Sequence, residues 1–341
     1  MDHLQLATRR KESEEGLALV RQQAAEHLSS IVSDEPLAIY VTGSFGRLEA
    51  RFPEGSDLDL FFLYGPRDRS HEKRPSQLTW FELAGELIRI ARRLRFEEFS
   101  RDGAFLQAHN VWHIGRQLGS QHEDSENGFT ARLLLLLESR YVLNEHLYRR
   151  FMEETIGFYY GDYSANRGTF RPTFLINDIL RFWRTLCLNY EHKRNRKRSD
   201  SAVENDNAPW RADSALDNLK LRFSRLSTCY SMVIALAAEP TPVGPERVLE
   251  LCSTAPTDRW SIAAQHASAG AAAEAGAKVE QILEAYDAFL ELMGDEDALR
   301  ERLTSHAERA STRRRAAAFG QLVSEFLLTT CQGDQLRTLL I

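Results

Sequence analysis

Hydrophobic residues recur along this chain with two different periods. Residues 12 to 32 place apolar side chains at helical spacing with charges between them, which predicts an amphipathic helix. Residues 37 to 43 form a short apolar run that is rich in β-formers and ends at a glycine, so they predict a buried strand. Residues 57 to 64 begin with alternation and end in a continuous apolar run. This second strand is entered by a loop or a short helix.

The pattern next predicts one more helix and a hairpin. Residues 75 to 94 have Pro at the start and apolar groups at helical intervals, as expected of a helix that covers a sheet. Residues 95 to 109 contain two short alternating segments joined at Arg101, Asp102 and Gly103, which predicts a hairpin.

From about residue 127 the pattern is helical. Helices are predicted over residues 131–142, 147–163, 173–194 and 216–237, and within the Ala-rich C-terminal third. The polar stretch from Asn195 to Asp213 predicts a mobile loop. We therefore expect an α+β fold, with a small mixed-sheet domain over residues 1–124 followed by an all-helical domain over residues 125–341.

Composition narrows the class of protein. The 341 residues include 43 Lys and Arg against 49 Asp and Glu, so the net charge is −6 and a basic coat for long duplex DNA is not expected. The apolar runs are shorter than the roughly 18 to 20 residues of a membrane span, so no membrane insertion is predicted. The first residues lack a secretory pattern, which predicts a cytoplasmic protein. The cysteines are expected to be buried apolar side chains in a reducing compartment: Cys187, Cys229, Cys252 and Cys331.

One segment contains candidate ligands for a metal ion and a phosphate group. Thr42-Gly43-Ser44 follows the first strand, and Asp57-Leu58-Asp59-Leu60 begins the second. Alternate residues of a strand share a face, so Asp57 and Asp59 project together while the leucines enter the core. Two neighbouring carboxylates repel each other unless a cation lies between them, and oxygen ligands suit Mg²⁺ or Mn²⁺. The glycine turn lets phosphate approach the backbone, so the segment predicts adjoining metal and phosphate sites.

This pattern, Gly-Ser, a spacer and then Asp-apolar-Asp-apolar, resembles the signature of the DNA polymerase β-type nucleotidyltransferase superfamily. The detailed match spans Tyr40 to Tyr64, and GSFGRLEARFPEGSDLDLFFL is most similar to the bacterial branch with the PII uridylyltransferases and their uncharacterised nucleotidyltransferase-like relatives. The resemblance implies that Gly43 and Ser44 bind a nucleoside triphosphate such as ATP and that Asp57 and Asp59 bind two metal ions. No HD-type phosphohydrolase motif follows the first domain.

The resemblance also implies a third carboxylate on a later strand. Glu97, Glu98 and Asp102 are the candidates, and Glu98 is preferred as the third catalytic metal ligand. A hairpin surface position is an equal alternative for Glu98. Without a third carboxylate the chain would be a nucleotide-binding pseudoenzyme.

Further residues are assigned to the nucleotide. Arg47 is predicted to brace a phosphate, or to form a salt bridge with Glu49 or Glu54, and Ser56 precedes the carboxylate pair. In the helical region, Lys220 and Ser224 are four residues apart and match a Lys-hydroxyl pair that family members use for the triphosphate. A solvated polar face is the alternative. Arg184, with Arg181, is predicted to line the same cleft.

A basic run, His192 to Arg198, contains five Lys or Arg residues. It predicts either a contact for an oligonucleotide backbone or a solvated helix end whose charge suits the helix dipole. Tyr190, just before it, could stack on a base or pack in the core.

These observations predict a metal-dependent nucleotidyltransferase that joins a nucleoside monophosphate to an acceptor hydroxyl and releases pyrophosphate. The expected product is a short oligonucleotide or nucleotide signal made without a template, as such enzymes make in bacterial antiviral defence. One alternative is nucleotidylylation of a protein or small molecule, as the PII-modifying branch implies. Another is a silent nucleotide-binding regulator of a protein partner or effector.

Overall fold

The computed structural model describes residues 3–32, 35–53, 55–65, 76–96, 99, 106–125, 127–201, 208–337 and 339. Within these residues the fold is α+β, as the pattern predicts, and its contacts group into two compact units. We call residues 7–167 and 244–255 the sheet unit, and residues 1–6, 168–243 and 256–341 the helical unit. The predicted boundary at residue 124 falls inside the sheet unit.

A mixed sheet organises the described part of the sheet unit. Its strands are β1 (Leu37–Val41), β2 (Leu60–Tyr64), β3 (Ala108–Asn110) and β4 (Arg140–Leu143). They lie in the order β3-β2-β1-β4, with β1 antiparallel to both β2 and β4 and with β3 parallel to β2. In the β1–β2 register Val41 pairs with Leu60, so the end of β1 meets the start of β2.

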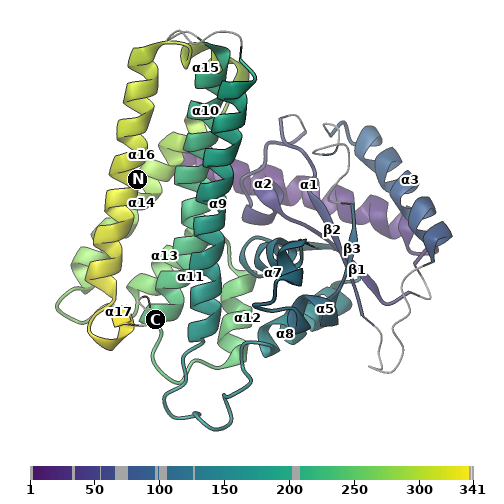
Figure 1. Ribbon diagram of the computed structural model, residues 1–341, viewed down its shortest axis with the longest axis horizontal. Coiled ribbons are helices and arrows are strands. Elements are labelled where there is room, and N and C mark those ends of the chain that lie inside the picture. The colour runs from purple at the N-terminus through teal and green to yellow at the C-terminus, as the bar shows by residue number, and fades with distance from the viewer. Residues whose placement is uncertain are drawn as a thin grey trace. The chain divides into compact units, whose positions relative to one another are not determined.

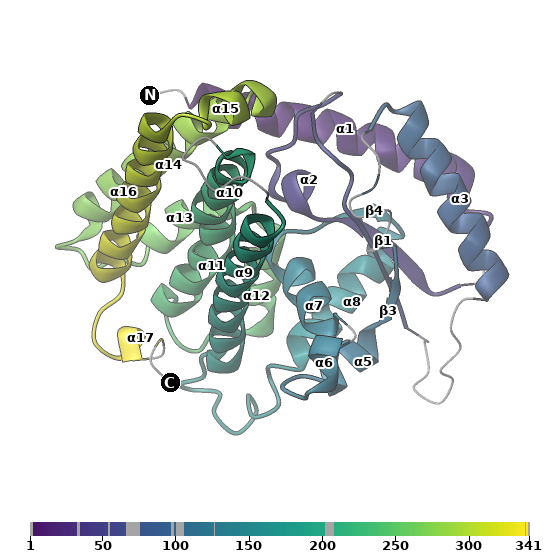
Figure 2. The same ribbon diagram turned by 45° about the horizontal axis from the view of Figure 1, so that its top comes forward.

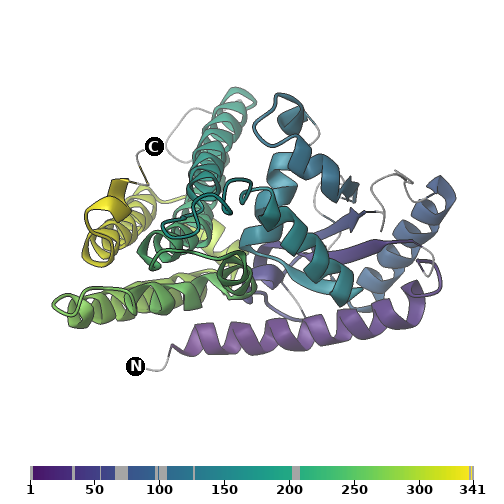
Figure 3. The same cartoon turned by 90° about the horizontal axis from the view of Figure 1, so that it is seen from below.

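Long helices cover one face of this sheet. Helices α1 (Leu4–Leu28) and α3 (Gln77–Arg93) pack on the face that carries Ile39 and Phe62, and together these elements form one hydrophobic core. Figure 3 shows α1, in purple, along this face of the sheet unit. The Ser76 hydroxyl caps α3 by accepting a hydrogen bond from the Thr79 N–H.

Shorter helices complete the sheet unit. They are α2 (Gly43–Arg47), α5 (Val111–Arg116), α6 (His122–Ser125), α7 (Gly128–Leu137), α8 (Glu145–Gly157) and α12 (Pro245–Ser253). On the sheet face opposite the α1 core, Tyr40 stacks on Phe61 with ring centroids 5.7 Å apart and lies 6.1 Å from the Tyr148 ring of α8. Arg132 of α7 is fully buried and bonds Glu123 at 2.8 Å.

Four sequence predictions need correction, and most of the hairpin predicted over residues 95–109 lies outside the described residues. The helix expected over residues 147–163 ends at Gly157. The helix expected over residues 131–142 ends at Leu137, and Arg140–Leu143 is strand β4 instead. The leucine run hides this boundary, which is set by pairing with β1. The predicted loop from Asn195 to Asp213 is shorter, because one helix extends to Ser199 and the next begins at Pro209. The second strand begins at Leu60, later than expected.

The helical unit is a bundle in which most helices are long. It contains α9 (Thr173–Ser199), α10 (Pro209–Lys220), the π-helical turn η1 (Leu221–Arg225), α11 (Leu226–Ala238), α13 (Pro256–Ala264), α14 (Ala272–Leu292), α15 (Glu296–Arg302), α16 (His306–Thr330) and α17 (Asp334–Arg337). Figures 1 and 2 show α9, α10 and α16 side by side. Helix α11 is almost entirely buried, and the Trp260 indole donates to the Ser227 hydroxyl at 3.2 Å inside this core.

Burial and bonding of the cysteines largely follow the prediction. All four are free thiols, and three are buried while Cys187 is half-buried. None of the described helices combines the length and apolar character that crossing a membrane requires.

Candidate functional site

The predicted phosphate and metal residues lie where β1 meets the start of β2. The Thr42 N–H donates to the Asp59 carbonyl at 2.9 Å, which continues the antiparallel pairing beyond the end of β1. Leu58 and Leu60 are buried in the core, whereas Asp57 and Asp59 are half-buried. The alternation predicted from the sequence is therefore present, and both carboxylates occur on the face opposite the α1 core.

Gly43 makes room for Asp59. It has a φ of +67°, in the region that side chains other than glycine rarely adopt. A Cβ atom at this position would lie 2.6 Å from the Asp59 Oδ2 atom. Any side chain at position 43 would therefore displace the carboxylate. The sequence links Gly43 and Asp59 only through their spacing, and the structure places them in contact.

Ser44 occupies the first turn of the short helix α2. The first intrahelical bond runs from the Gly46 N–H to the Thr42 carbonyl at 3.2 Å, so the N–H groups of residues 43 to 45 precede it. The Ser44 side chain is half-buried, and the Ser44 backbone carbonyl accepts a hydrogen bond from the Glu49 N–H at 2.8 Å. This turn therefore brings backbone donors and a hydroxyl next to Asp59.

Ser56 has a local structural partner. Its hydroxyl accepts a hydrogen bond from the Arg51 N–H at 2.9 Å, which closes the loop before the carboxylate pair. The bond fixes the approach of the chain to Asp57.

Arg47 forms a buried salt bridge, the alternative to a phosphate contact. Only 8% of it is exposed, and its Nε atom donates to Glu49 at 2.8 Å. Its Nη1 atom donates to Glu138 at 2.9 Å, a partner that the sequence does not suggest. Gly46 allows this approach, because a Cβ there would lie 1.9 Å from the Glu138 carbonyl oxygen. Arg47 therefore joins α2 to the end of α7.

The third carboxylate remains a prediction. Glu97, Glu98 and Asp102 lie outside the described residues. On the described part of β3, His109 pairs with Leu63, which puts it on the same sheet face as Asp59. Among the residues that are described, no group of three His, Cys, Asp or Glu side chains forms a metal cluster.

The donors that are described suit an oxygen-ligated ion. Asp57 and Asp59 are carboxylates two positions apart just before β2, and the Asp59 carboxylate lies against Gly43 of the turn. Mg²⁺ is commonly held by one or two carboxylates together with substrate phosphates. The residues present therefore fit such an ion.

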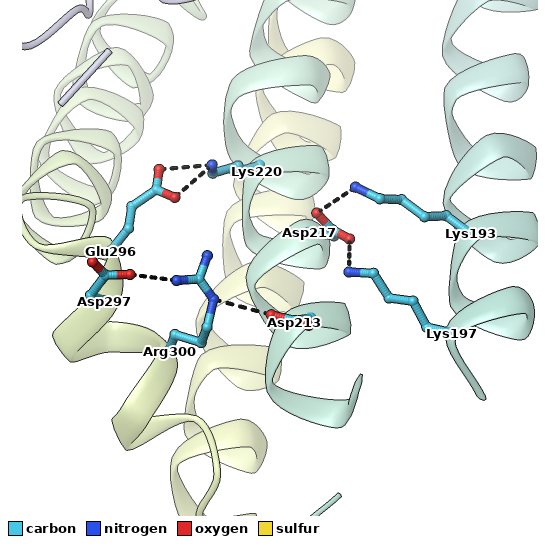
Figure 4. A network of polar contacts seen from close by, with 8 residues as sticks. All are labelled: Lys193, Lys197, Asp213, Asp217, Lys220, Glu296, Asp297 and Arg300. Atoms are coloured by element: carbon cyan, nitrogen blue, oxygen red, sulfur yellow. Dashed lines mark hydrogen bonds and ion pairs between the residues drawn. The ribbon is translucent and has the colours of Figure 1, made fainter. Parts of the chain in front are cut away.

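In the helical unit, Lys220 pairs with a carboxylate from another helix. Its Nζ atom lies 2.7 Å from Glu296 Oε1, and Figure 4 shows this pair on α10 and α15. Ser224 is only 6% exposed, so it does not share the exposed face of Lys220. The cause is η1, in which the hydrogen bonds span five residues instead of four and alter the α-helical spacing. Arg184 is exposed on α9.

The same helices carry a groove that the sequence does not reveal. A cavity of about 890 Å³ lies between α9, α10 with η1 and α11, and α16. Arginines and aromatic side chains line it, among them Arg194, Arg222, Arg313, Tyr190 and Trp210. In the sequence, groove-lining residues recur every four positions from Trp210 to Tyr230. This pattern indicates a groove only once α9 and α16 are known to line it as well.

Comparison with known proteins gives no match: no family model, curated protein or solved structure is similar to this chain.

Proposed function

We propose that this protein is a metal-dependent nucleotidyltransferase whose sheet unit has the polymerase β-type fold. The observation that carries the proposal is the contact between Gly43 and Asp59. Gly43 has a positive φ and follows the first strand by two residues, and the carboxylate of Asp59, just before the second strand, lies against it. The closeness of the Gly-Ser turn to Asp59 supports the proposal, because nucleotidyl transfer requires bound phosphate beside metal-binding carboxylates.

Each residue of the site has a role in this proposal. Asp57 and Asp59 hold the divalent ions, and the Ser44 hydroxyl and the N–H groups of the α2 turn bind phosphate oxygens. When bound, the ions activate the acceptor oxygen and neutralise charge on the leaving pyrophosphate. Glu98, the preferred third carboxylate, would accept the proton of the acceptor hydroxyl. Arg47 holds the α2 turn in place through its salt bridges with Glu49 and Glu138.

The acceptor that we propose is the hydroxyl of another nucleotide, which gives a short oligonucleotide or a nucleotide signal. Lys220 and Arg184 stay proposed nucleotide contacts, whereas the burial of Ser224 argues against a contact of its side chain. The exposed pair of Lys220 with Glu296 costs little to break, since such pairs contribute about 0–1 kcal/mol.

Labelled nucleotides test this function. The protein is incubated with each ribo- and deoxynucleoside triphosphate and Mg²⁺ or Mn²⁺, and products are resolved by gel and mass spectrometry while pyrophosphate is measured. We expect nucleotide ladders or cyclic products, and a loss of about 100-fold or more in the Asp57→Asn/Asp59→Asn variant. Asp162→Asn is the matched control, because Asp162 is an exposed carboxylate of the same unit.

Two outcomes would overturn the enzymatic proposal. One is no pyrophosphate release with any nucleotide and either ion. The other is equal release by the wild type and the double Asp variant. Label on a protein band instead of a nucleotide ladder would keep the reaction type and replace the acceptor.

A further inference from the structure

We propose that the groove between α9, α10–α11 and α16 binds a short single-stranded nucleic acid. The groove belongs wholly to the helical unit, and the inference does not depend on the transferase activity proposed above. Three observations carry it: the charge of the lining, its aromatic side chains, and buried polar atoms without partners.

The lining is basic although the chain as a whole is acidic. Glu191 is the sole acid among the described residues that line the groove, and Arg194 holds it at 2.9 Å. Five arginines contribute to the same lining: Arg194, Arg198, Arg211, Arg222 and Arg313. Arg222 and Arg313 are exposed, and neither makes a hydrogen bond or ion pair with another described residue. The groove therefore presents positive charge to an anionic occupant.

The basic run of the sequence divides between two faces of α9. Arg194 and Arg198 line the groove, whereas Lys193 and Lys197 bond Asp217 of α10 at 3.1 and 2.9 Å. Figure 4 shows these lysines directed to the Asp217 carboxylate. Burial alone would raise the pKa of Asp217, but the hydrogen bonds from Lys197 and Lys193 outweigh it and hold that pKa below its ordinary value. Asp217 of α10 thus neutralises the two lysines and not the arginines of the lining, of which Arg222 and Arg313 make no ion pair with another described residue.

Aromatic rings lie among the arginines. Trp183, Tyr190, Trp210 and Tyr230 all line the groove, and the last three are half-buried. Trp183 packs edge-on against Tyr230 at 5.8 Å, and the Arg211 guanidinium lies 4.8 Å from the Trp210 ring centroid. Aromatic rings within a basic groove are the combination on which bases stack in single-stranded nucleic acid sites. An acidic peptide would use the arginines but not the rings.

The groove wall also contains polar atoms that lack partners. Ser214 is 5% exposed, and neither its Oγ atom nor the Trp210 Nε1 atom has a hydrogen-bond partner among the described residues. Such buried groups cost about 1–3 kcal/mol each when they stay unpaired. A sugar or base edge carries donors and acceptors that can satisfy them.

Small residues on α16 leave space on that side of the groove. Ala316, Ala317 and Gly320 line the groove from α16, where larger side chains would fill it. The lining residues that recur every four positions from Trp210 to Tyr230 form a stripe along α10, η1 and α11. This lining stripe covers about 30 Å at the usual helical rise of about 1.5 Å per residue. An elongated groove of this size suits several nucleotides in a row.

Fluorescence anisotropy with a labelled eight-nucleotide single strand, as DNA and as RNA, tests the proposal in the absence of triphosphates and divalent ions. We expect binding to weaken about tenfold in Arg222→Gln/Arg313→Gln, and the slope of log K against log salt to decrease by about 1.4, that is, about 0.7 for each phosphate that no longer meets an arginine. The matched control is Arg314→Gln/Arg315→Gln, which removes the same charge from exposed α16 positions outside the lining. It should bind within about twofold of wild type.

A second variant tests the aromatic contribution. Tyr190→Leu should weaken oligonucleotide binding about fivefold or more while leaving binding of a polyglutamate of equal charge unchanged. Its circular dichroism melting curve must match that of the wild type, and Trp210→Leu replaces it if it does not.

The proposal is overturned if the single strand fails to bind at low salt, or if the control pair weakens binding as much as the groove pair. Polyglutamate or a mononucleotide that binds as tightly as the octamer would also overturn it. Asp57→Asn/Asp59→Asn should bind the octamer as the wild type does, so failure of the transferase proposal and failure of this one are separate results.

Discussion

Two pairs of arginines, one pair in each unit, illustrate opposite uses of a charged side chain. In the sheet unit, Arg47 and Arg132 are buried and bonded to glutamates, so their charge is neutralised inside the fold. In the helical unit, Arg222 and Arg313 are exposed along a groove. Breaking a buried pair leaves an uncompensated charge in the interior, whereas an exposed arginine is already solvated. The environment of an arginine, and not its place in a motif, therefore decides whether it supports the fold or is available to a ligand.

Replacing Arg47 should have the largest effect. Arg47→Met leaves Glu49 and Glu138 buried without their shared cation, so we expect the free energy of unfolding to fall by about 3–5 kcal/mol. Urea unfolding measures this. Arg313→Met, the matched change in the groove, should alter the free energy of unfolding by less than about 0.5 kcal/mol. If Arg47→Met kept full stability, the claim that its charge is structural would be wrong.

Gly43→Ala should affect both stability and catalysis. The positive φ alone costs a side chain about 1–2 kcal/mol, and the added Cβ would push against Asp59 Oδ2. We expect pyrophosphate release to be lost at a temperature where the variant is still folded. Gly85→Ala is the control, because Gly85 lies within α3 with open space beside it. That change should stabilise the protein by about 0.4–1 kcal/mol and leave the activity unchanged.

High pH should destabilise the protein partly through Tyr148. Burial raises the pKa of this phenol from 10.0 to about 12, so the folded state holds the proton more tightly than the unfolded state. Its contribution is fully present below pH 10 and is lost as the pH rises from 10 to 12, with a slope of at most about 1.4 kcal/mol per pH unit. Tyr148→Phe should make the stability curve flatter in that window, as measured by urea unfolding at several pH values. An unchanged slope would contradict the assignment.

Breaking the pair of Lys220 with Glu296 should have only a small effect on stability. Both side chains are exposed, so Glu296→Gln should lower the free energy of unfolding by less than about 1 kcal/mol, and less still at high salt. Thermal unfolding at two salt concentrations tests this. A decrease comparable to that of Arg47→Met would erase the contrast between the two units.

The sequence predicts the elements whose signal is local. The helix over residues 75–94 appears as α3, and the apolar run after Pro36 appears as β1, because periodicity and turn residues are read within a few positions. Strand β4 could not be predicted, since Arg140–Leu143 continues a leucine-rich helix and becomes a strand only by pairing with β1.

The residues of the candidate site also divide into those with a local sequence signal and those that depend on distant contacts. The sequence predicts Gly43, Asp57 and Asp59 from their spacing along the chain, because one turn and the start of one strand position all three. Glu138, the second partner of Arg47, lies 91 positions away and carries no local signal. The groove depends on α9, α10 and α16 meeting, and its stripe on α10 and α11 resembles an ordinary buried helix face.

The π-helical turn η1 has a consequence for the phase of that stripe. An α-helix turns about 100° per residue, so each four-residue step overshoots a full turn by about 40°, and the five steps from Trp210 to Tyr230 would wind about 200° around the axis. The widened turn at Leu221–Arg225 absorbs one extra residue and so takes back about half of this rotation. The extra residue of η1 thereby limits the drift of the stripe to about 100°, and if the same residues formed a regular α-helix, Tyr230 would turn about a further 100° away from Trp210.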